Sequence, residues 1–278
     1  MRCDAADLGR HVAARSVELA YLDPPFAVGK AFEHRKRGVV AYDDTWPSHE
    51  AYLAWLDARI RVVYKLLSDR GTMWLHLDHR AVHEAKVVCD AIFGRAQFLG
   101  EIVWVPGNGS KARKGPGTTH QTLLLYARGK SPVWNGKDPL LREPYAATSQ
   151  SMHFTRKDAS GRRYRERVIG GRTYRYYADE GRAIGSVWSD CPAMHANTPL
   201  RSETTGYPTQ KPLKLLERIV RASSDEGALV LDPFCGSGTT LVAAQKHGRA
   251  YFGCDISPLA VGIAKERLVL AESFSARS

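Results

Sequence analysis

The chain has 278 residues, of which 44% are hydrophobic and 25% charged, so it can bury a core as one large domain or as a domain with an insertion. No apolar run approaches the roughly 18 residues of a membrane span, no signal-peptide hydrophobic region follows Met1, and the five scattered cysteines argue against a disulfide scaffold or a zinc site, as expected of a cytoplasmic protein. The net charge of +11 favours a polyanionic partner such as nucleic acid, without distinguishing DNA from RNA.

Apolar spacing in the first half of the chain predicts strands and helices. Residues 17–22 form a short apolar run that Pro24 and Pro25 end, as in a buried strand. Apolar residues at helical spacing follow over 49–67, with Ser48 as the cap. The further predicted elements are a strand at 72–77, a helix at 81–93, and strands at 98–105 and 121–127 around a Gly- and Lys-rich loop at 106–119.

The pattern changes in the middle of the chain and then returns. From about Trp134 to Trp188 periodicity is lost, and arginines and tyrosines crowd together. After Pro212 the predicted elements are a helix at 214–223, a strand at 228–231, a helix at 239–247, a strand at 249–254 and a helix at 259–270. Strands that alternate with helices predict a parallel, doubly wound α/β sheet, with the middle segment as an insertion at one end.

A glycine turn separates a predicted strand from a predicted helix where the sequence reads LVLDPFCGSGTT. Gly236 and Gly238 let a ligand approach the backbone closely at a helix N-terminus. A third glycine of the dinucleotide fingerprint is missing, which disfavours NAD and leaves room for a ligand without a pyrophosphate. Asp255 ends the next strand, where an acid can accept hydrogen bonds from two ribose hydroxyls. Together these features predict a site for a nucleoside-bearing cofactor.

The first predicted strand ends in Asp23, Pro24, Pro25 and Phe26. Such a turn can be purely structural, because proline ends a strand. It also suits methylation of an aromatic amino nitrogen, whose lone pair is delocalised into the ring and must be localised before attack. Asp23 and the rigid carbonyl of Pro24 would each accept one N–H and stabilise the developing positive charge, while Phe26 would stack on a flipped base. This displacement needs no metal.

These motifs, in this order, resemble those of the N6-adenine and N4-cytosine amino-methyltransferases of DNA. Because the Asp-Pro-Pro-Phe turn comes first and the glycine loop comes near the C-terminus, the chain is similar to the permuted group called the β class. Stretches at 16–22, 74–78, 100–104 and 206–212 are also similar to this family. The resemblance therefore spans nearly the whole chain.

The resemblance implies a fold, a cofactor and partners. The fold would be a Rossmann-like methyltransferase domain with a catalytic half at 1–133, an inserted target-recognition region at 134–205 and a cofactor-binding half at 206–278. The cofactor would be S-adenosyl-L-methionine, and the main partner DNA. A homodimer, and a cognate restriction endonuclease in a restriction-modification system, are further partners that the sequence leaves open.

Roles for individual residues follow from the same resemblance. The residues implied at the cofactor are Asp232, Phe234, Gly236, Gly238, Asp255, Thr209, Lys211 and Asp4. Asp255 would bind the ribose, Thr209 and Lys211 would lie beside the cofactor, and Asp4 would touch its adenine. Only three residues precede Asp4, so its strand would be shorter than in the family, which leaves the role of Asp4 and a start upstream of Met1 open.

The basic middle segment at 155–182 interleaves arginines with tyrosines. Arginine makes bidentate contacts with phosphates and guanine edges, and tyrosine stacks on bases, although the same composition is common on a solvated β-hairpin. Its place between the two halves matches the target-recognition region of the family, which implies DNA contact by Arg156, Lys157, Arg162, Arg163, Arg165, Tyr174 and Arg175. Further candidates are Lys111 and Arg113 in the Gly-rich loop and the basic residues at 35–37.

The sequence thus predicts site-specific methyl transfer to the N6 amino group of adenine in DNA, with the base flipped out of the duplex. In this family, aspartate at the head of the turn favours adenine and serine favours cytosine, so N4-cytosine methylation is the nearest alternative. An RNA or protein-amide methyltransferase would usually carry the glycine loop first. A non-catalytic DNA-binding regulator would not need intact Asp23, Gly236, Gly238 and Asp255.

Overall fold

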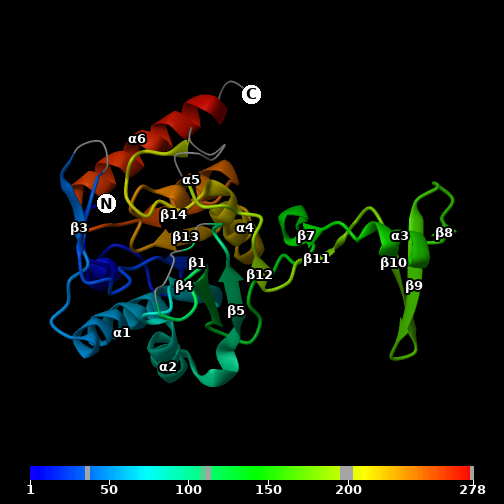
Figure 1. Ribbon diagram of the computed structural model, residues 1–278, viewed down its shortest axis with the longest axis horizontal. Helices are drawn as coiled ribbons and strands as arrows, with labels where there is room; N and C mark the ends of the chain where they lie inside the picture. The colour runs from blue at the N-terminus through cyan, green and yellow to red at the C-terminus, as the bar shows by residue number, and fades with distance from the viewer. Residues whose placement is uncertain (35–37, 108, 110–113, 195–202, 276–278) are drawn as a thin grey trace. The chain divides into compact units, whose positions relative to one another are not determined.

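The computed structural model describes residues 1–34, 38–107, 109, 114–194 and 203–275 (Figure 1). Contacts divide the chain into a larger unit, Met1–Trp134 with Ser186–Ser278, and a smaller unit, Asn135–Gly185. The smaller unit lies within the region predicted at 134–205, and the rest of that region belongs to the larger unit. Within the described ranges, no helix is both long enough and apolar enough to cross a membrane.

A seven-stranded sheet forms the centre of the larger unit, in the order β12-β5-β6-β4-β1-β13-β14. Its strands are β1 (Val17–Leu22), β4 (Leu67–Leu77), β5 (Phe98–Trp104), β6 (Gln121–Ala127), β12 (Val187–Trp188), β13 (Leu229–Asp232) and β14 (Ala250–Gly253). The pairs β1–β4, β1–β13, β13–β14 and β5–β12 are parallel. β6 runs antiparallel to β4 and β5, so the prediction of a parallel sheet is wrong at this strand. An antiparallel neighbour needs no crossover helix, and periodicity does not reveal strand direction.

The central strands β1 and β6 are buried along nearly their whole length, which explains their nearly continuous apolar sequences. The helices of this unit are α1 (His49–Leu66), α2 (Val82–Phe93), α4 (Leu213–Ser223), α5 (Thr239–Lys246) and α6 (Pro258–Ser275), with short 3₁₀ helices η1 (Ala5–Arg10) and η2 (Arg95–Gln97). Met73 and Leu75 of β4 join the core formed with α1 and α2. Trp74 between them faces the other side of the sheet, where its indole N–H donates to Ser223 Oγ of α4 at 3.0 Å. α4 packs against α5, and α5 packs against α6 (Figure 1).

β1 and β13 are neighbours although more than half of the chain separates them. Leu19 pairs with Val230, and Ala20 pairs with Leu231, in parallel register. The sheet grows from β1 to β4 on one side and from β13 to β14 on the other, so a crevice is expected at the carboxyl ends between β1 and β13. The Asp-Pro-Pro-Phe turn and the glycine loop meet at this edge.

The larger unit contains two further short features near the N-terminus, a hairpin and an isolated bridge. A hairpin of β2 (Ala31–Glu33) and β3 (Val40–Asp43) follows the Asp-Pro-Pro-Phe turn, and its strands are too short to show a clear alternation in the sequence. The strand expected before Asp4 is reduced to one parallel bridge between Arg2 and Asp255.

The smaller unit is built from short elements and one longer hairpin. They are η3 (Pro139–Leu141), β7 (Arg142–Glu143), α3 (Ala147–His153), β8 (Arg156–Lys157), β9 (Arg163–Ile169), β10 (Arg172–Tyr177) and β11 (Arg182–Ala183). β9 and β10 are antiparallel and joined by Gly170 and Gly171, which have φ values of 56° and 76°. Two positive φ values in a two-residue loop give the turn that matches the twist of a hairpin.

Candidate active site

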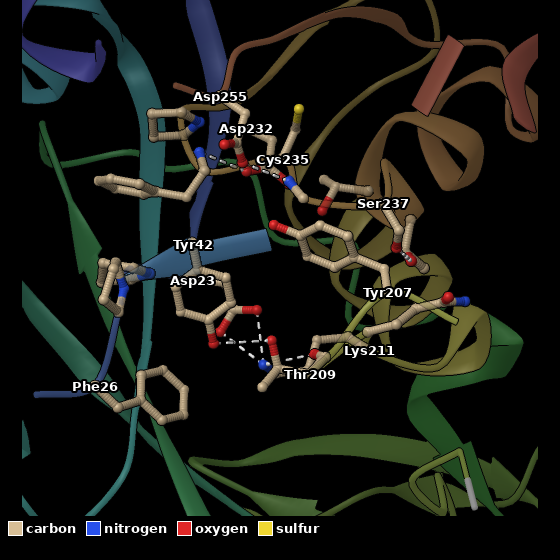
Figure 2. A pocket seen from close by; sticks show the side chains of 18 of the residues that line it. Asp23, Phe26, Tyr42, Tyr207, Thr209, Lys211, Asp232, Cys235, Ser237 and Asp255 are labelled. Carbon is tan, nitrogen blue, oxygen red and sulfur yellow. Dashed lines mark hydrogen bonds and ion pairs between the residues drawn. The ribbon is translucent and has the colours of Figure 1, made fainter. Parts of the chain in front are cut away.

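A cavity of about 390 Å³ lies in the larger unit at the carboxyl ends of β1 and β13 (Figure 2). The residues predicted from the sequence that line it are Asp4, Asp23, Pro24, Pro25, Phe26, Thr209, Lys211, Asp232, Phe234, Gly236 and Asp255. They come from distant segments, and the parallel pairing of β1 with β13 brings the two main motifs to one edge of the sheet.

Asp23 forms an ion pair with Lys211. Lys211 Nζ lies 2.7 Å from each carboxylate oxygen of Asp23, and Figure 2 shows the two side chains pointing toward each other. Burial raises the pKa of Asp23 above its ordinary value, and the ammonium of Lys211 acts in the opposite direction. Lys211, which we predicted beside the cofactor, thus contacts the carboxylate that we predicted to be catalytic.

The carbonyls of Pro24 and Pro25 differ in their hydrogen bonding. The carbonyl of Pro25 accepts a hydrogen bond from the Tyr52 hydroxyl of α1 at 2.8 Å. No described residue donates to the carbonyl of Pro24, which is the second acceptor that the predicted chemistry requires.

Asp44 fixes the shape of the main chain that follows the Asp-Pro-Pro turn. Its carboxylate accepts four N–H hydrogen bonds, from the backbone of Phe26 (3.1 Å), Ala27 (2.9 Å) and Val28 (2.9 Å) and from the indole of Trp46 (2.8 Å). Asp44 is 1% exposed, and charge-assisted hydrogen bonds are strong when they are shielded from water. They help to hold Ala27 at a φ of 56°, a conformation that residues other than glycine seldom adopt.

Sequence reasoning missed Asp44 because its partners are mainly backbone N–H groups, which no pattern of residue types reveals. It also missed Tyr42, whose hydroxyl lies 3.3 Å from Thr209 Oγ1 in the cavity wall. The closely spaced aromatic and acidic residues at 42–44, of which Asp44 lies 18 residues after Phe26, are the signal that could have drawn attention to this segment.

The glycine loop and Asp255 are joined by hydrogen bonds. Gly236 has a φ of 47°, and its N–H donates to Asp255 Oδ2 at 3.0 Å. The N–H of Ser257 donates to Asp255 Oδ1 at 2.9 Å. A Cβ on Gly236 would lie 3.2 Å from the ring of Tyr207, so glycine also allows this close approach. Each oxygen of Asp255 retains a lone pair for a hydroxyl donor.

Asp232 and Phe234 form another part of the wall. Asp232 Oδ1 accepts a hydrogen bond from the N–H of Phe234 at 3.0 Å, and burial raises the pKa of Asp232 to about 7. The ring of Phe234 lies 5.6 Å from that of Trp55, and Arg59 lies over the Trp55 ring. Arg59 also pairs with Asp4 at 2.6 Å, so Asp4 lines the cavity with one oxygen already engaged by a cation.

Gly238 does not line the cavity, in contrast to the other predicted residues of the glycine loop. Its φ is 77°, and a Cβ there would lie 2.7 Å from Cβ of Ala264. The prediction that Gly238 touches a ligand is therefore not supported by this geometry, and the glycine instead permits close packing of α5 against α6.

The candidate DNA-contacting residues lie in the smaller unit or outside the described residues. Those in the smaller unit are Arg156, Lys157, Arg162, Arg163, Arg165, Tyr174 and Arg175. Lys111, Arg113 and residues 35–37 lie outside the described residues. Arg156 and Arg175 both pair with Glu166, and Arg162 pairs with Asp179.

The cavity wall is acidic. Its described carboxylic acids are Asp4, Asp23, Asp43, Asp44, Asp232 and Asp255, and its described bases are Arg59 and Lys211. The wall also carries aromatic rings from Phe26, Tyr42, Trp55, Tyr207 and Phe234. Such a cavity suits a cationic ligand with a flat ring better than a polyphosphate.

Comparison with known proteins points to one family. The model of the N6/N4 methyltransferase family, described as DNA methylase, matches residues 17–266. The type II methyltransferase M.EcaI of Enterobacter cloacae is 29% identical, over 94% of this chain and 67% of its own length. The DNA adenine methyltransferase YhdJ of Escherichia coli (strain K12) is 28% identical, over 96% and 81%.

A solved structure shows the same fold. TTHA0409 of Thermus thermophilus, complexed with S-adenosyl-L-methionine, superimposes with a TM-score of 0.57 at 22% identity, over 97% of this chain and 94% of that one. The predicted Rossmann-like methyltransferase fold is therefore confirmed. Because the family match covers most of the chain, the protein belongs to the DNA methylase family of N6 and N4 amino-methyltransferases.

Proposed function

We propose that this DNA methylase transfers a methyl group from S-adenosyl-L-methionine to the N6 amino group of adenine at specific sites in DNA. The observation that carries the proposal is the presence of Asp23 and Pro24 in the wall of the same cavity as Gly236 and Asp255. Direct transfer requires the donor and the acceptor amine to meet in one site, and this cavity combines the features predicted for each.

The chemistry of the cavity fits S-adenosylmethionine. This molecule carries a sulfonium and an ammonium group, which suit a wall with six carboxylic acids and two bases among its described residues. The residues that would hold it are Asp232, Phe234, Gly236 and Asp255, and Thr209 also lies in the cavity wall. When bound, the cofactor supplies an electrophilic methyl group.

Asp23 and Pro24 would bind and orient the target amino group. Two acceptors, one carboxylate and one carbonyl, hold both N–H bonds and direct the nitrogen lone pair away from the ring. Lys211 favours the ionised form of Asp23, the form that can only accept hydrogen bonds. The amino group would share or replace the contact that Lys211 makes with Asp23.

Adenine is favoured over cytosine by two observations. Asp23 stands at the head of the catalytic turn, where the family resemblance associates aspartate with adenine. The relative YhdJ, which aligns over 96% of this chain, is a DNA adenine methyltransferase. The matched family includes both N6 and N4 enzymes, so the modified base must be identified directly.

Access to the amino group requires the base to leave the duplex. An exocyclic amine inside a base pair cannot reach a cavity wall, and enzymes that modify bases flip them out of the stack. Phe26 lines the cavity and would offer a ring face to the flipped base. The smaller unit would contact the surrounding DNA as the target-recognition region.

The proposal is tested with tritiated S-adenosylmethionine and unmethylated DNA. The wild-type protein should transfer label to DNA, and Asp23→Ala should lower kcat by at least about 100-fold, because it removes a charged acceptor that acts during attack. Calorimetry should show that the variant binds S-adenosylmethionine within about threefold of wild type.

Asp57→Ala is the matched control. Asp57 pairs with Arg61 on the surface of α1, and its loss should leave methyl transfer unchanged. Substantial activity in Asp23→Ala, or loss of activity in both variants, would contradict the proposed role of Asp23.

A further inference from the structure

The β9–β10 hairpin of the smaller unit has two chemically different faces. Side chains alternate between faces along a strand, and directly paired residues share a face. One face, here called the arginine face, contains Arg163, Arg165, Arg167, Ile169, Arg172, Tyr174 and Tyr176. The other, here called the glutamate face, contains Tyr164, Glu166, Val168, Thr173, Arg175 and Tyr177.

Cations on the glutamate face are neutralised within the smaller unit. Arg175 lies 3.1 Å from a carboxylate oxygen of Glu166, and Arg156 of β8 pairs with the same side chain. Arg175 also stacks over the ring of Tyr164 at 4.2 Å. Phosphate binding here would require these contacts to be broken, so the arginines of this face serve mainly to stiffen the hairpin.

Two arginines of the arginine face also have structural partners. Arg163 donates to the carbonyls of Phe154 and Gln150 at 2.8 and 2.7 Å, which satisfies the end of α3. Arg165 lies 5.0 Å from the centre of the Phe154 ring. Both guanidinium groups therefore hold the hairpin against α3.

Arg167 and Arg172 differ from the other arginines of the hairpin. Both are exposed, and in the part of the chain that the structure describes no carboxylate lies within ion-pair distance of either. Tyr174 pairs across the strands with Arg167 and is 43% exposed. Arg167 and Arg172 are diagonal neighbours, which lie about 7–8 Å apart in an antiparallel pair. They can thus reach neighbouring phosphates of one strand.

The two faces of the hairpin also differ in their acidic residues. The arginine face carries none, whereas the glutamate face carries Glu166. A phosphate backbone is attracted by unpaired cations and repelled by a carboxylate, so it favours the arginine face.

We propose that the tip of the arginine face, formed by Arg167, Arg172 and Tyr174, is the surface of the smaller unit that docks on the DNA backbone. This assignment rests on the proposed function, since it takes DNA as the substrate. It moves the main phosphate contacts from Arg156, Arg162 and Arg175, which are paired internally, to Arg167 and Arg172. Tyr174 adds stacking or hydroxyl contact beside them.

The test compares two double variants with the same loss of charge. Arg167→Gln/Arg172→Gln changes the arginine face, and Arg156→Gln/Arg175→Gln changes the glutamate side. Binding of a fluorescent duplex is measured between 50 and 300 mM salt, roughly the range in which counterion release is resolved. KM for DNA, kcat and the affinity for S-adenosylmethionine are measured in parallel, with thermal unfolding as a check on folding.

The first double variant should weaken duplex binding at least about tenfold and reduce the slope of log K against log salt by about two, because each phosphate contact contributes about 0.9. Its kcat at saturating DNA and its affinity for S-adenosylmethionine should stay within about twofold of wild type. The control should change the slope by less than about 0.5. Tyr174→Ala should weaken binding without changing the slope, since it removes no charge.

Equal weakening in both double variants would overturn the proposal, because it would show that only the total charge matters. So would unchanged binding in Arg167→Gln/Arg172→Gln. If the wild type methylates DNA in either case, the proposed function stands and only the docking surface is wrong. If the wild type transfers no methyl group to DNA, the proposed function fails, while the slopes still report whether this face binds DNA.

Discussion

Asp23 and Asp44 are carboxylates of the same turn region with different environments. Asp23 faces the cavity and the ammonium of Lys211. Asp44 accepts backbone N–H groups from Phe26, Ala27 and Val28 and is almost fully buried. We therefore expect Asp23 to exchange its partner for a substrate group, whereas Asp44 stabilises the main chain that follows Asp23.

Replacing Asp44 with asparagine should reduce catalysis more than cofactor binding. The amide places an NH₂ group where two oxygens now accept four N–H bonds, so some donors lose their acceptor and the turn loosens. We expect Asp44→Asn to lower kcat at least about tenfold, with the affinity for S-adenosylmethionine within about threefold, measured by steady-state kinetics and calorimetry.

Asp57→Asn is the control for this prediction, and it should leave kcat unchanged. Asp57 lies on α1, is not among the residues of the cavity wall, and pairs with Arg61 on the surface. A fully active Asp44→Asn enzyme would show that the turn keeps its shape without the carboxylate.

The ionisation of Asp232, a residue of the cavity wall, makes the stability of the fold depend on pH. Its folded-state pKa is raised by burial from 3.8 to about 7, so the folded protein binds more protons than the unfolded chain between these values. Asp232 therefore makes its full contribution to the free energy of unfolding below about pH 4, and this contribution is lost as the pH rises through about 7. Asp232→Asn, which never ionises, should raise Tm relative to wild type more at about pH 8 than at about pH 5. A Tm difference independent of pH would contradict this assignment.

At the scale of elements, the close packing of α5 against α6 depends on Gly238. This residue has a positive φ, and a Cβ would meet Ala264 of α6 at 2.7 Å. Gly238→Ala should destabilise the fold by about 1–3 kcal/mol in denaturant unfolding. Gly262→Ala in the same helix pair is the control, since nothing lies within 4 Å of its Cβ, and it should be neutral or slightly stabilising. Equal effects of the two substitutions would contradict the packing role of Gly238.

The long elements could be predicted from the sequence because their apolar periodicity reflects burial in this fold. The helix expected at 49–67 is α1 (His49–Leu66), and the strand expected at 17–22 is β1. The β2–β3 hairpin was missed because short strands leave little periodic signal. The direction of β6 was missed because alternation is the same in parallel and antiparallel strands.

At the scale of the whole molecule, the central sheet explains how two motifs that lie far apart in the sequence come close together in space. The resemblance predicted that the catalytic turn and the glycine loop share one domain, and β1–β13 pairing brings them to one edge. The pairing of Lys211 with Asp23 could not be predicted, since it depends on side-chain geometry across 188 residues of sequence. Similarly, the excess of positive charge predicted a polyanionic partner, but not which arginines are neutralised by nearby acids.

The identity of the methylated base tests the central claim most directly. Unmethylated duplex DNA is incubated with the wild-type protein and isotopically labelled S-adenosylmethionine, digested to nucleosides and analysed by mass spectrometry. We expect label in N6-methyladenine, and almost none in DNA treated with Asp23→Ala. Label in N4-methylcytosine would contradict the assignment of adenine, and the absence of label from all DNA nucleosides would contradict the proposed function.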